Sequence, residues 1–152
     1  MDYDLIIIGS GPAGMAAGIY AGRSEMKTLL LEKMMVGGQV SQTMDIANYP
    51  GFPDSIDGPS LADRMQKQAE KFGVEFKQAE AKALVKDGSG FAVTINRDEV
   101  IKAKTVILST GSDPRKLGVP GDVMWGGDWL NPALNIRPGD PMQGLTIPRP
   151  IY

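Results

Sequence analysis

Apolar runs and a stretch of small residues alternate at the start of the chain. Residues 5–8 form an unbroken apolar run, residues 12–22 are rich in alanine and glycine, and residues 27–32 form a second apolar segment. An apolar run of about four to eight residues is typical of a strand buried on both faces, as in a parallel sheet. The pattern therefore predicts a strand, a closely packed helix and a second parallel strand, which is the beginning of an α/β fold.

A helical period returns after a long segment without clear periodicity. Residues 40–57 contain several turn-forming residues, so we expect an irregular loop that could form one wall of a ligand site. Residues 58–73 predict an amphipathic helix that ends at Gly73, and Asp63 and Lys67 can pair one turn apart on it. The apolar residues at helical spacing are Leu61, Met65, Ala69 and Phe72.

Short strand-length segments follow this helix. They are residues 74–76, 79–85 and 91–95, with a further strand beginning at residue 100. Turn-rich connections at residues 86–90 and 96–99 favour hairpins, so these segments predict a small antiparallel β-meander. Residues 104–109 form another apolar run, which predicts an additional strand of the parallel sheet.

The composition changes after residue 121. Prolines and glycines recur through residues 122–152 without a helical or strand period, although both tryptophans of the chain lie there. This composition predicts an extended and weakly ordered tail, which could dock in part on the folded domain. We therefore expect a folded domain of residues 1–121 followed by a divergent Pro/Gly-rich tail of residues 122–152.

The overall composition argues against several classes of function. The 152 residues carry a net charge of −2, which argues against nucleic acid as the main partner. No apolar run approaches the length of a membrane span and the first residues lack a basic signal region, so we expect no membrane partner and a cytoplasmic location. The chain contains no cysteine and no histidine. No catalytic or metal-binding residue is predicted, and any chemistry would come from a bound cofactor.

The strongest chemical signal is a glycine-rich turn after the first predicted strand. Gly9, Gly11 and Gly14 have G-x-G-x-x-G spacing, and Glu32 ends the next strand about 20 residues further on. Such glycines allow a tight turn, a close backbone approach to a pyrophosphate and close packing of the helix on the sheet. An acidic residue at that distance accepts hydrogen bonds from ribose hydroxyls and repels a 2′-phosphate. These residues predict a dinucleotide site that is NAD-like or FAD-like and not NADP-like.

Several further segments give the chain a resemblance to the low-molecular-weight thioredoxin reductase family, over about its first four fifths. The segments that carry it are residues 3–14, 31–33, 37–39, 48–52, 58–59, 68–73, and 109–111 leading to 114–121. The resemblance implies an α/β, Rossmann-like FAD-binding domain in which helices pack on a parallel sheet with a small antiparallel β-meander. It also implies that the domain is incomplete relative to the family, whose members are NADPH-linked disulfide oxidoreductases.

The resemblance implies FAD as the cofactor and assigns it a set of binding residues. The pyrophosphate would lie on Gly9, Ser10, Gly11, Pro12, Ala13 and Gly14. Glu32 would bind the adenosine ribose, with Lys33 and Ala81 near the adenine. The flavin ring and ribityl chain would be bordered by Gly38, Gln39, Thr43, Asn48, Thr110 and Gly111. Ser109 stands where the family has alanine, which is a mild change.

The chain departs from the family after residue 121. It lacks the redox dithiol, the second G-x-G-x-x-G motif for NADPH and the late Gly-Asp segment that completes the FAD domain. The lost return segment is expected to leave one edge of the parallel sheet unpaired, which favours either a folded-back tail or association with a second copy or a partner chain. Two other interpretations stay open: a non-enzymatic dinucleotide-binding or interaction module, and an NAD-binding domain that uses the same glycine-rich turn.

Overall fold

A single mixed sheet organises residues 1–112, which are the residues that the computed structural model describes. The predicted domain boundary at residue 121 and the predicted tail of residues 122–152 lie outside these described residues. Within them the sheet has six strands in the order β3-β2-β1-β6-β5-β4. The strands are β1 (Tyr3–Ile8), β2 (Thr28–Glu32), β3 (Glu75–Gln78), β4 (Ala81–Asp87), β5 (Gly90–Ile95) and β6 (Glu99–Leu108). The helices are α1 (Pro12–Arg23), the 3-10 helix η1 (Gly38–Gln42) and α2 (Gly58–Lys71).

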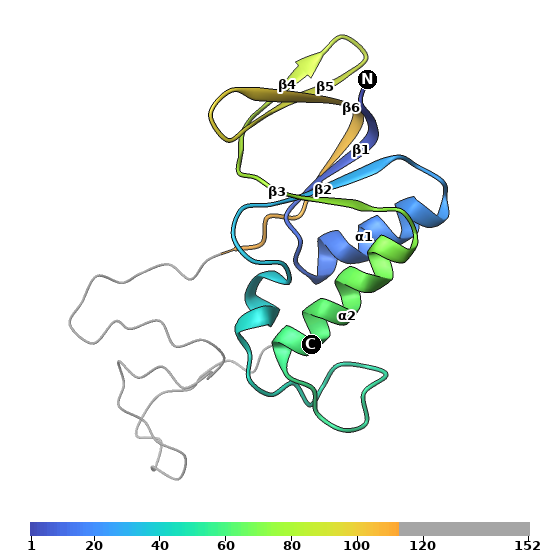
Figure 1. Cartoon of the computed structure of the whole chain (residues 1–152), viewed down its shortest axis with the longest axis vertical. Coiled ribbons are helices and arrows are strands. Elements are labelled where there is room, and N and C mark those ends of the chain that lie inside the picture. The colour runs from blue at the N-terminus through green and yellow to red at the C-terminus, as the bar shows by residue number, and fades with distance from the viewer. Residues whose placement is uncertain (113–152) are drawn as a thin grey trace, which may run out of the picture. The chain divides into compact units, whose positions relative to one another are not determined.

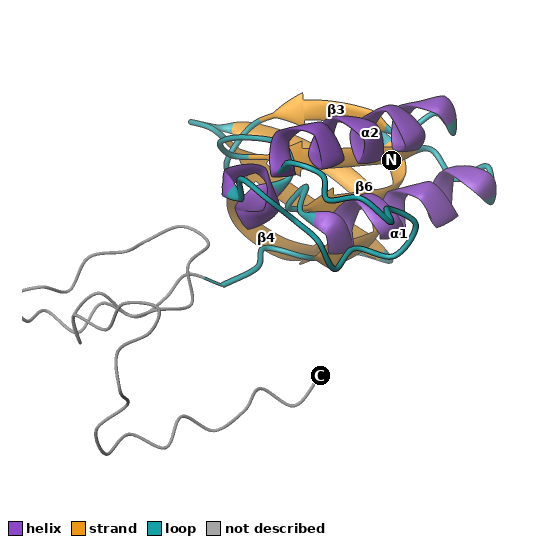
Figure 2. Cartoon of the chain, turned by 90° about the horizontal axis from the view of Figure 1, so that it is seen from below, coloured by secondary structure: helices purple, strands orange, loops and turns teal. Residues whose placement is uncertain are grey.

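The parallel half of the sheet carries both long helices on one of its faces (Figure 2). β1 pairs in parallel with β2 and β6, and β2 pairs in parallel with β3. Alternate residues of the central strands face the helices and form one core cluster with them. This cluster is Leu5, Ile7, Met15, Ala21, Leu30, Ala69 and Val74. The predicted strand, helix and parallel strand are therefore confirmed.

The antiparallel half of the sheet contributes to a second core cluster. β5 pairs antiparallel with both β4 and β6, and Figure 1 shows these three strands at the end of the sheet nearest the N-terminus. Their inward residues pack with the residues of β1 and β2 that point away from the helices. The cluster is Ile6, Leu29, Leu31, Ala79, Val93, Ile95, Ile101 and Ala103. Successive side chains along β1 and β2 point to opposite faces of the sheet, so the apolar run of each strand contributes to both core clusters.

Two sequence-based expectations about strands were wrong. The segment after α2 is not part of the meander, because β3 begins at Glu75 and pairs in parallel with β2 on the far side of the sheet. The two strands expected near residues 100 and 104–109 are one strand of ten residues, β6. Lys102 and Lys104 are exposed while Ile101 and Ala103 are buried, so the alternation of a strand continues where polar lysines suggested a break.

The predicted amphipathic helix is confirmed in α2. Leu61 and Ala69 are buried, and Lys67 donates to Asp63 at 2.8 Å one turn away. The sequence interpretation missed its N-cap, Asp57, whose carboxylate accepts from the Ser60 N–H at 2.8 Å. Hydrogen bonds from the Ser60 hydroxyl and from the Ser60 N–H hold the pKa of the Asp57 carboxyl below its ordinary value.

No helix within residues 1–112 is long and apolar enough to cross a bilayer.

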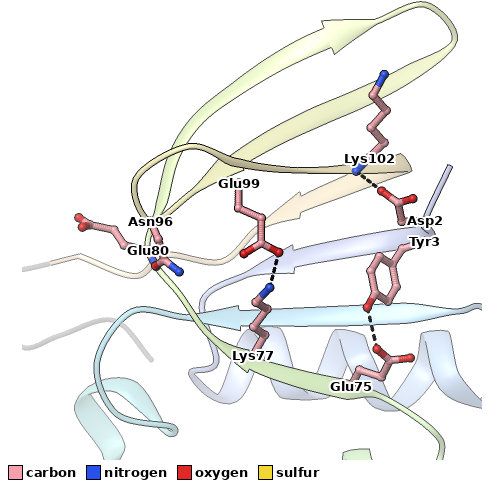
Figure 3. A network of polar contacts seen from close by, with 8 residues as sticks. All are labelled: Asp2, Tyr3, Glu75, Lys77, Glu80, Asn96, Glu99 and Lys102. Atoms are coloured by element: carbon pink, nitrogen blue, oxygen red, sulfur yellow. Dashed lines mark hydrogen bonds and ion pairs between the residues drawn. The ribbon is translucent and has the colours of Figure 1, made fainter.

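Exposed polar contacts connect strands at the surface of the sheet (Figure 3). Lys77 of β3 pairs with Glu99 at the start of β6, although β2 and β1 lie between these two strands in the sheet. The Tyr3 hydroxyl donates to the Glu75 carboxylate at 2.7 Å, and this hydrogen bond raises the pKa of Tyr3 to about 12. Exposed ion pairs contribute little to stability. These contacts therefore show which strands lie close together, but they do not account for the stability of the sheet.

Beyond Ala103, one side of β6 lacks a partner strand in the described part of the chain. β6 pairs with β5 only from Glu99 to Ala103, while β1 pairs with its other side as far as Leu108. Ile107 and Leu108 are 38% and 64% exposed. An apolar groove beside this edge is bordered by residues of β1, α1 and β6 and by the α1–β2 connection, including Leu5, Ala17, Tyr20, Ala21, Met26 and Ile107.

Candidate dinucleotide-binding site

The carboxyl ends of the parallel strands β1, β2 and β6 lie side by side at the same end of the sheet. The Gly9 N–H after β1 donates to the Leu31 carbonyl of β2 at 2.9 Å. On the other side, the Ser109 N–H after β6 donates to the Ile8 carbonyl at 2.9 Å. Ligands of α/β sheets bind at the carboxyl ends of the strands. The fold therefore brings the glycine-rich turn, the end of β2 and the end of β6 to the place where a ligand is expected.

Two glycines of the turn are required by the protein itself. Gly9 has a φ of 104°, a conformation that other residues rarely adopt, and a Cβ there would lie 2.4 Å from the Ser109 carbonyl oxygen. A Cβ on Gly14 would lie only 1.9 Å from the Gly9 carbonyl oxygen. Because Gly14 is in the first turn of α1, the missing side chain lets the helix approach the loop. Tight turning and close packing thus explain both glycines without a ligand.

Gly11 is not explained in this way. Its φ of −66° suits any residue, and an added Cβ would meet no atom of the described chain within 4 Å. Gly11 is also the N-cap of α1, and it makes no side-chain cap hydrogen bond. Within residues 1–112, neither backbone conformation nor packing requires a glycine at this position. The absence of a side chain would instead let an anion approach the backbone beside the helix N-terminus.

Glu32 points at the glycine-rich turn. Its Oε2 accepts from the Ser10 N–H at 3.0 Å and from the Ser10 hydroxyl at 2.6 Å, while Oε1 accepts from the Met34 N–H at 3.0 Å. Partial burial acts to raise the pKa of the Glu32 carboxyl. The hydrogen bonds from Met34 and Ser10 outweigh it and hold that pKa below its ordinary value. The carboxylate is therefore charged at neutral pH and could accept hydrogen bonds from a ribose while repelling a 2′-phosphate.

The loop after β2 covers one side of the turn. The Gly37 N–H donates to the Ser10 carbonyl at 3.0 Å, and a Cβ on Gly38 would lie 3.4 Å from the Gly11 Cα. Gln39 of η1 donates through its side-chain amide to the Ser112 carbonyl, beyond Thr110 and Gly111 at the end of β6. The structure thus brings Gly38 to the glycine-rich turn and joins Gln39 to the segment that follows β6.

The remaining predicted residues lie at different distances from this arrangement. Ala81 begins β4 just after Ala79, whose N–H donates to the Glu32 carbonyl at 2.8 Å. Lys33 pairs with Glu80 at 2.9 Å and so lies at the same corner. Thr43 closes η1, because its N–H donates to the Val40 carbonyl at 3.0 Å. Asn48 is exposed in the following loop.

Ser109 is a residue of this region whose role the sequence analysis missed. Its hydroxyl donates to the Gly9 carbonyl at 2.9 Å and to the Ile8 carbonyl at 3.1 Å. These hydrogen bonds tie β6 to the glycine-rich turn across about 100 positions of sequence. A polar residue that ends an apolar strand is the only signal in the sequence, and it does not reveal the partner.

The arrangement of strands, turn and acidic residue defines a Rossmann-like α/β domain of the dinucleotide-binding type. The profile of the family described as pyridine nucleotide-disulphide oxidoreductase matches residues 3–137. The chain belongs to this family.

Its curated relatives include thioredoxin reductases from several bacteria. The Bacillus subtilis protein is 43% identical over 125 residues, which are 82% of this chain and 39% of the relative. The Peptoclostridium acidaminophilum protein is 47% identical over 120 residues, 79% of this chain and 38% of the relative. The chain thus spans about two fifths of the length of these relatives. The resemblance to thioredoxin reductases and its extent over the first four fifths of the chain are confirmed.

Solved structures give the same result for the fold. Thioredoxin reductase from Lactococcus lactis aligns with a TM-score of 0.73 at 44% identity, covering 78% of this chain and 39% of that one. The enzyme from Streptococcus pyogenes aligns with a TM-score of 0.72 at 46% identity, covering 78% and 38%. The predicted Rossmann-like fold, partial relative to the family, is therefore confirmed.

Proposed function

We propose that this chain is the FAD-binding portion of a thioredoxin-reductase-like flavoprotein. Residues 1–121 would form the FAD-binding part, and residues 122–152 would be a divergent tail. The relatives are reductases, and this chain corresponds to about two fifths of their length. Because it contains no cysteine, it has no thiol pair of its own to pass electrons to a disulfide. The chain alone would bind the flavin cofactor without being a complete reductase.

The observation that carries this proposal is the bare backbone at Gly11. Gly9 and Gly14 are explained by contacts within the protein, but Gly11 is not. A dinucleotide pyrophosphate over the N-terminus of α1 would account for it, because the helix N–H groups and dipole favour an anion there. The Glu32 carboxylate beside the same turn would accept the ribose hydroxyls.

The residues fit the two halves of FAD in different degrees. The adenosine diphosphate half would contact Gly9, Ser10, Gly11, Pro12, Ala13, Gly14, Glu32, Lys33 and Ala81. The flavin half would contact Gly38, Gln39, Thr43, Asn48, Thr110 and Gly111. Redox chemistry would be supplied by the bound flavin, while the residues of the chain hold and orient it. A location in the cytoplasm remains a prediction.

The direct test is binding of FAD to the full chain after any copurifying cofactor has been removed. We expect saturable one-to-one binding in a calorimetric titration, with a yellow complex whose flavin fluorescence differs from that of free FAD. NADH is expected to compete weakly. Because no nicotinamide-binding motif follows the first glycine-rich turn, anaerobic NADPH is expected to leave the flavin spectrum unbleached.

Two results of this titration would contradict the proposal. A chain with a folded circular dichroism spectrum that does not bind FAD would instead favour a non-enzymatic interaction module. A chain that binds NADH more tightly than FAD would favour a nicotinamide dinucleotide site.

We also propose that the free edge of β6 and its neighbouring groove are covered in the functional protein. The cover would be the tail of residues 122–152, a second copy or a partner chain, because exposed edges promote association. Limited proteolysis that removes the tail is expected to change either the solubility or the oligomer size seen by sedimentation velocity. A chain that is monomeric both before and after removal of the tail, with unchanged solubility, would refute cover by the tail and by a second copy.

A further inference from the structure

Ser10 occupies an unusual position in the glycine-rich turn. It is fully buried, although the turn around it is partly open to solvent. Its N–H and hydroxyl both donate to one oxygen of Glu32, and its carbonyl accepts from the Gly37 N–H at 3.0 Å. A single serine therefore connects the turn, the end of β2 and the loop that follows β2.

These contacts fix the Glu32 carboxylate. An ionised carboxylate has about four acceptor sites. Ser10 takes two of them on Oε2, and the Met34 N–H takes one on Oε1. The Lys33 N–H also donates to this carboxylate, so donors of the chain hold both of its oxygens. A ribose hydroxyl would thus meet a carboxylate whose orientation is already set, so binding would cost little additional ordering of the side chain.

We propose that Ser10 is a positioning residue that sets the ribose specificity of the site by fixing Glu32. This inference rests on the proposed dinucleotide-binding function. The hydroxyl donates to Oε2 at 2.6 Å, which fixes the carboxylate beside the glycine-rich turn and holds its negative charge where a 2′-phosphate would have to lie. Without the hydroxyl, Oε2 keeps only the Ser10 N–H, so the carboxylate is held less firmly. Both the gain from a free 2′-hydroxyl and the repulsion of a 2′-phosphate then decrease.

The test compares Ser10→Ala, Glu32→Ala and the double variant in the full chain. The ligands are ADP-ribose, its 2′-phosphate and FAD, with affinities from calorimetry. Loss of a hydrogen bond to a charged group is expected to weaken ADP-ribose and FAD about tenfold in Ser10→Ala. Preference for ADP-ribose over its 2′-phosphate should fall by a similar factor. In the Glu32→Ala background the same serine change should alter affinity by less than about twofold, because Ser10 acts through Glu32.

A second measurement needs no ligand. Carbon NMR titration of the Glu32 carboxyl is expected to show an upward shift of its pKa in Ser10→Ala, because the charged form loses a donor. Ser10→Gly removes the same hydroxyl and replaces Ser10→Ala if the latter does not fold. An unchanged Glu32 pKa, or equal losses of affinity in both backgrounds, would overturn the inference while leaving FAD binding intact. Failure of the unaltered chain to bind all three ligands would overturn the proposed function, and this inference with it.

Discussion

Gly14→Ala is expected to destabilise the folded domain strongly, because the first turn of α1 has no room for a methyl group at this position. The new Cβ would lie 1.9 Å from the Gly9 carbonyl oxygen and 2.7 Å from the Ser109 Oγ. Neither obstacle can move freely, because the first is backbone and the second donates to two carbonyls of the β1 end. Overpacking commonly costs about 1–3 kcal/mol, and we expect a loss of about 3 kcal/mol or more in the free energy of unfolding. Urea denaturation followed by far-UV circular dichroism measures it.

Gly18→Ala is the matched control because it adds the same methyl group to the same helix. Its Cβ would meet the Val74 methyl groups at 3.5 Å and Ile7 Cδ1 at 3.6 Å, which are ordinary contacts. Replacement of a mid-helix glycine by alanine is favourable by roughly 0.5–1 kcal/mol, so this variant should be as stable as the unaltered chain or more stable. If Gly14→Ala unfolded at the same urea concentration as Gly18→Ala, the close approach of α1 to the turn would be wrong.

The glycine-rich turn and Glu32 could be predicted from sequence because their signals are local. The spacing of Gly9, Gly11 and Gly14 follows directly from the geometry of a strand, a tight turn and a helix. Glu32 was recognised by its distance from the turn and its place at the end of an apolar run. The sequence could not distinguish the three glycines by cause. Only the structure separates two that serve packing from one that does not.

Contacts between distant segments could not be predicted in the same way. The hydrogen bond from Ser109 to Gly9 joins residues 100 positions apart, and no local pattern specifies it. The parallel pairing of β3 with β2 was missed for a related reason. β3 has only four residues, two of them exposed, so its pattern does not indicate which strand it joins. The alternation of β6 was divided in two because exposed lysines interrupt its apolar character. β5 pairs with the first half of this strand and β1 with its second half, and the two pairings meet at Ala103, which explains its continuity.

Gly11→Ala is expected to abolish most FAD binding while leaving the fold intact. The Gly11 backbone conformation suits alanine, and the added methyl meets nothing in the described chain within 4 Å, so stability should change by less than about 1 kcal/mol. If a pyrophosphate lies against this backbone, the methyl group takes its place. We expect affinity for FAD to fall on the order of 100-fold, equivalent to about 2.7 kcal/mol of binding free energy. Calorimetric titration with FAD and urea denaturation of the same preparation measure the two quantities separately.

The contrast between Gly11 and the other small residues of α1 makes this prediction specific to a ligand. Gly18→Ala adds a methyl group on the same helix but faces the sheet, where Val74 and Ile7 surround it, so it should bind FAD as the unaltered chain does. Gly14→Ala should lose both stability and binding, because it displaces the helix from the turn. Only Gly11→Ala is expected to separate the two properties. Undiminished FAD affinity in that variant would mean that the pyrophosphate does not pass over Gly11, and the bare backbone there would need another explanation.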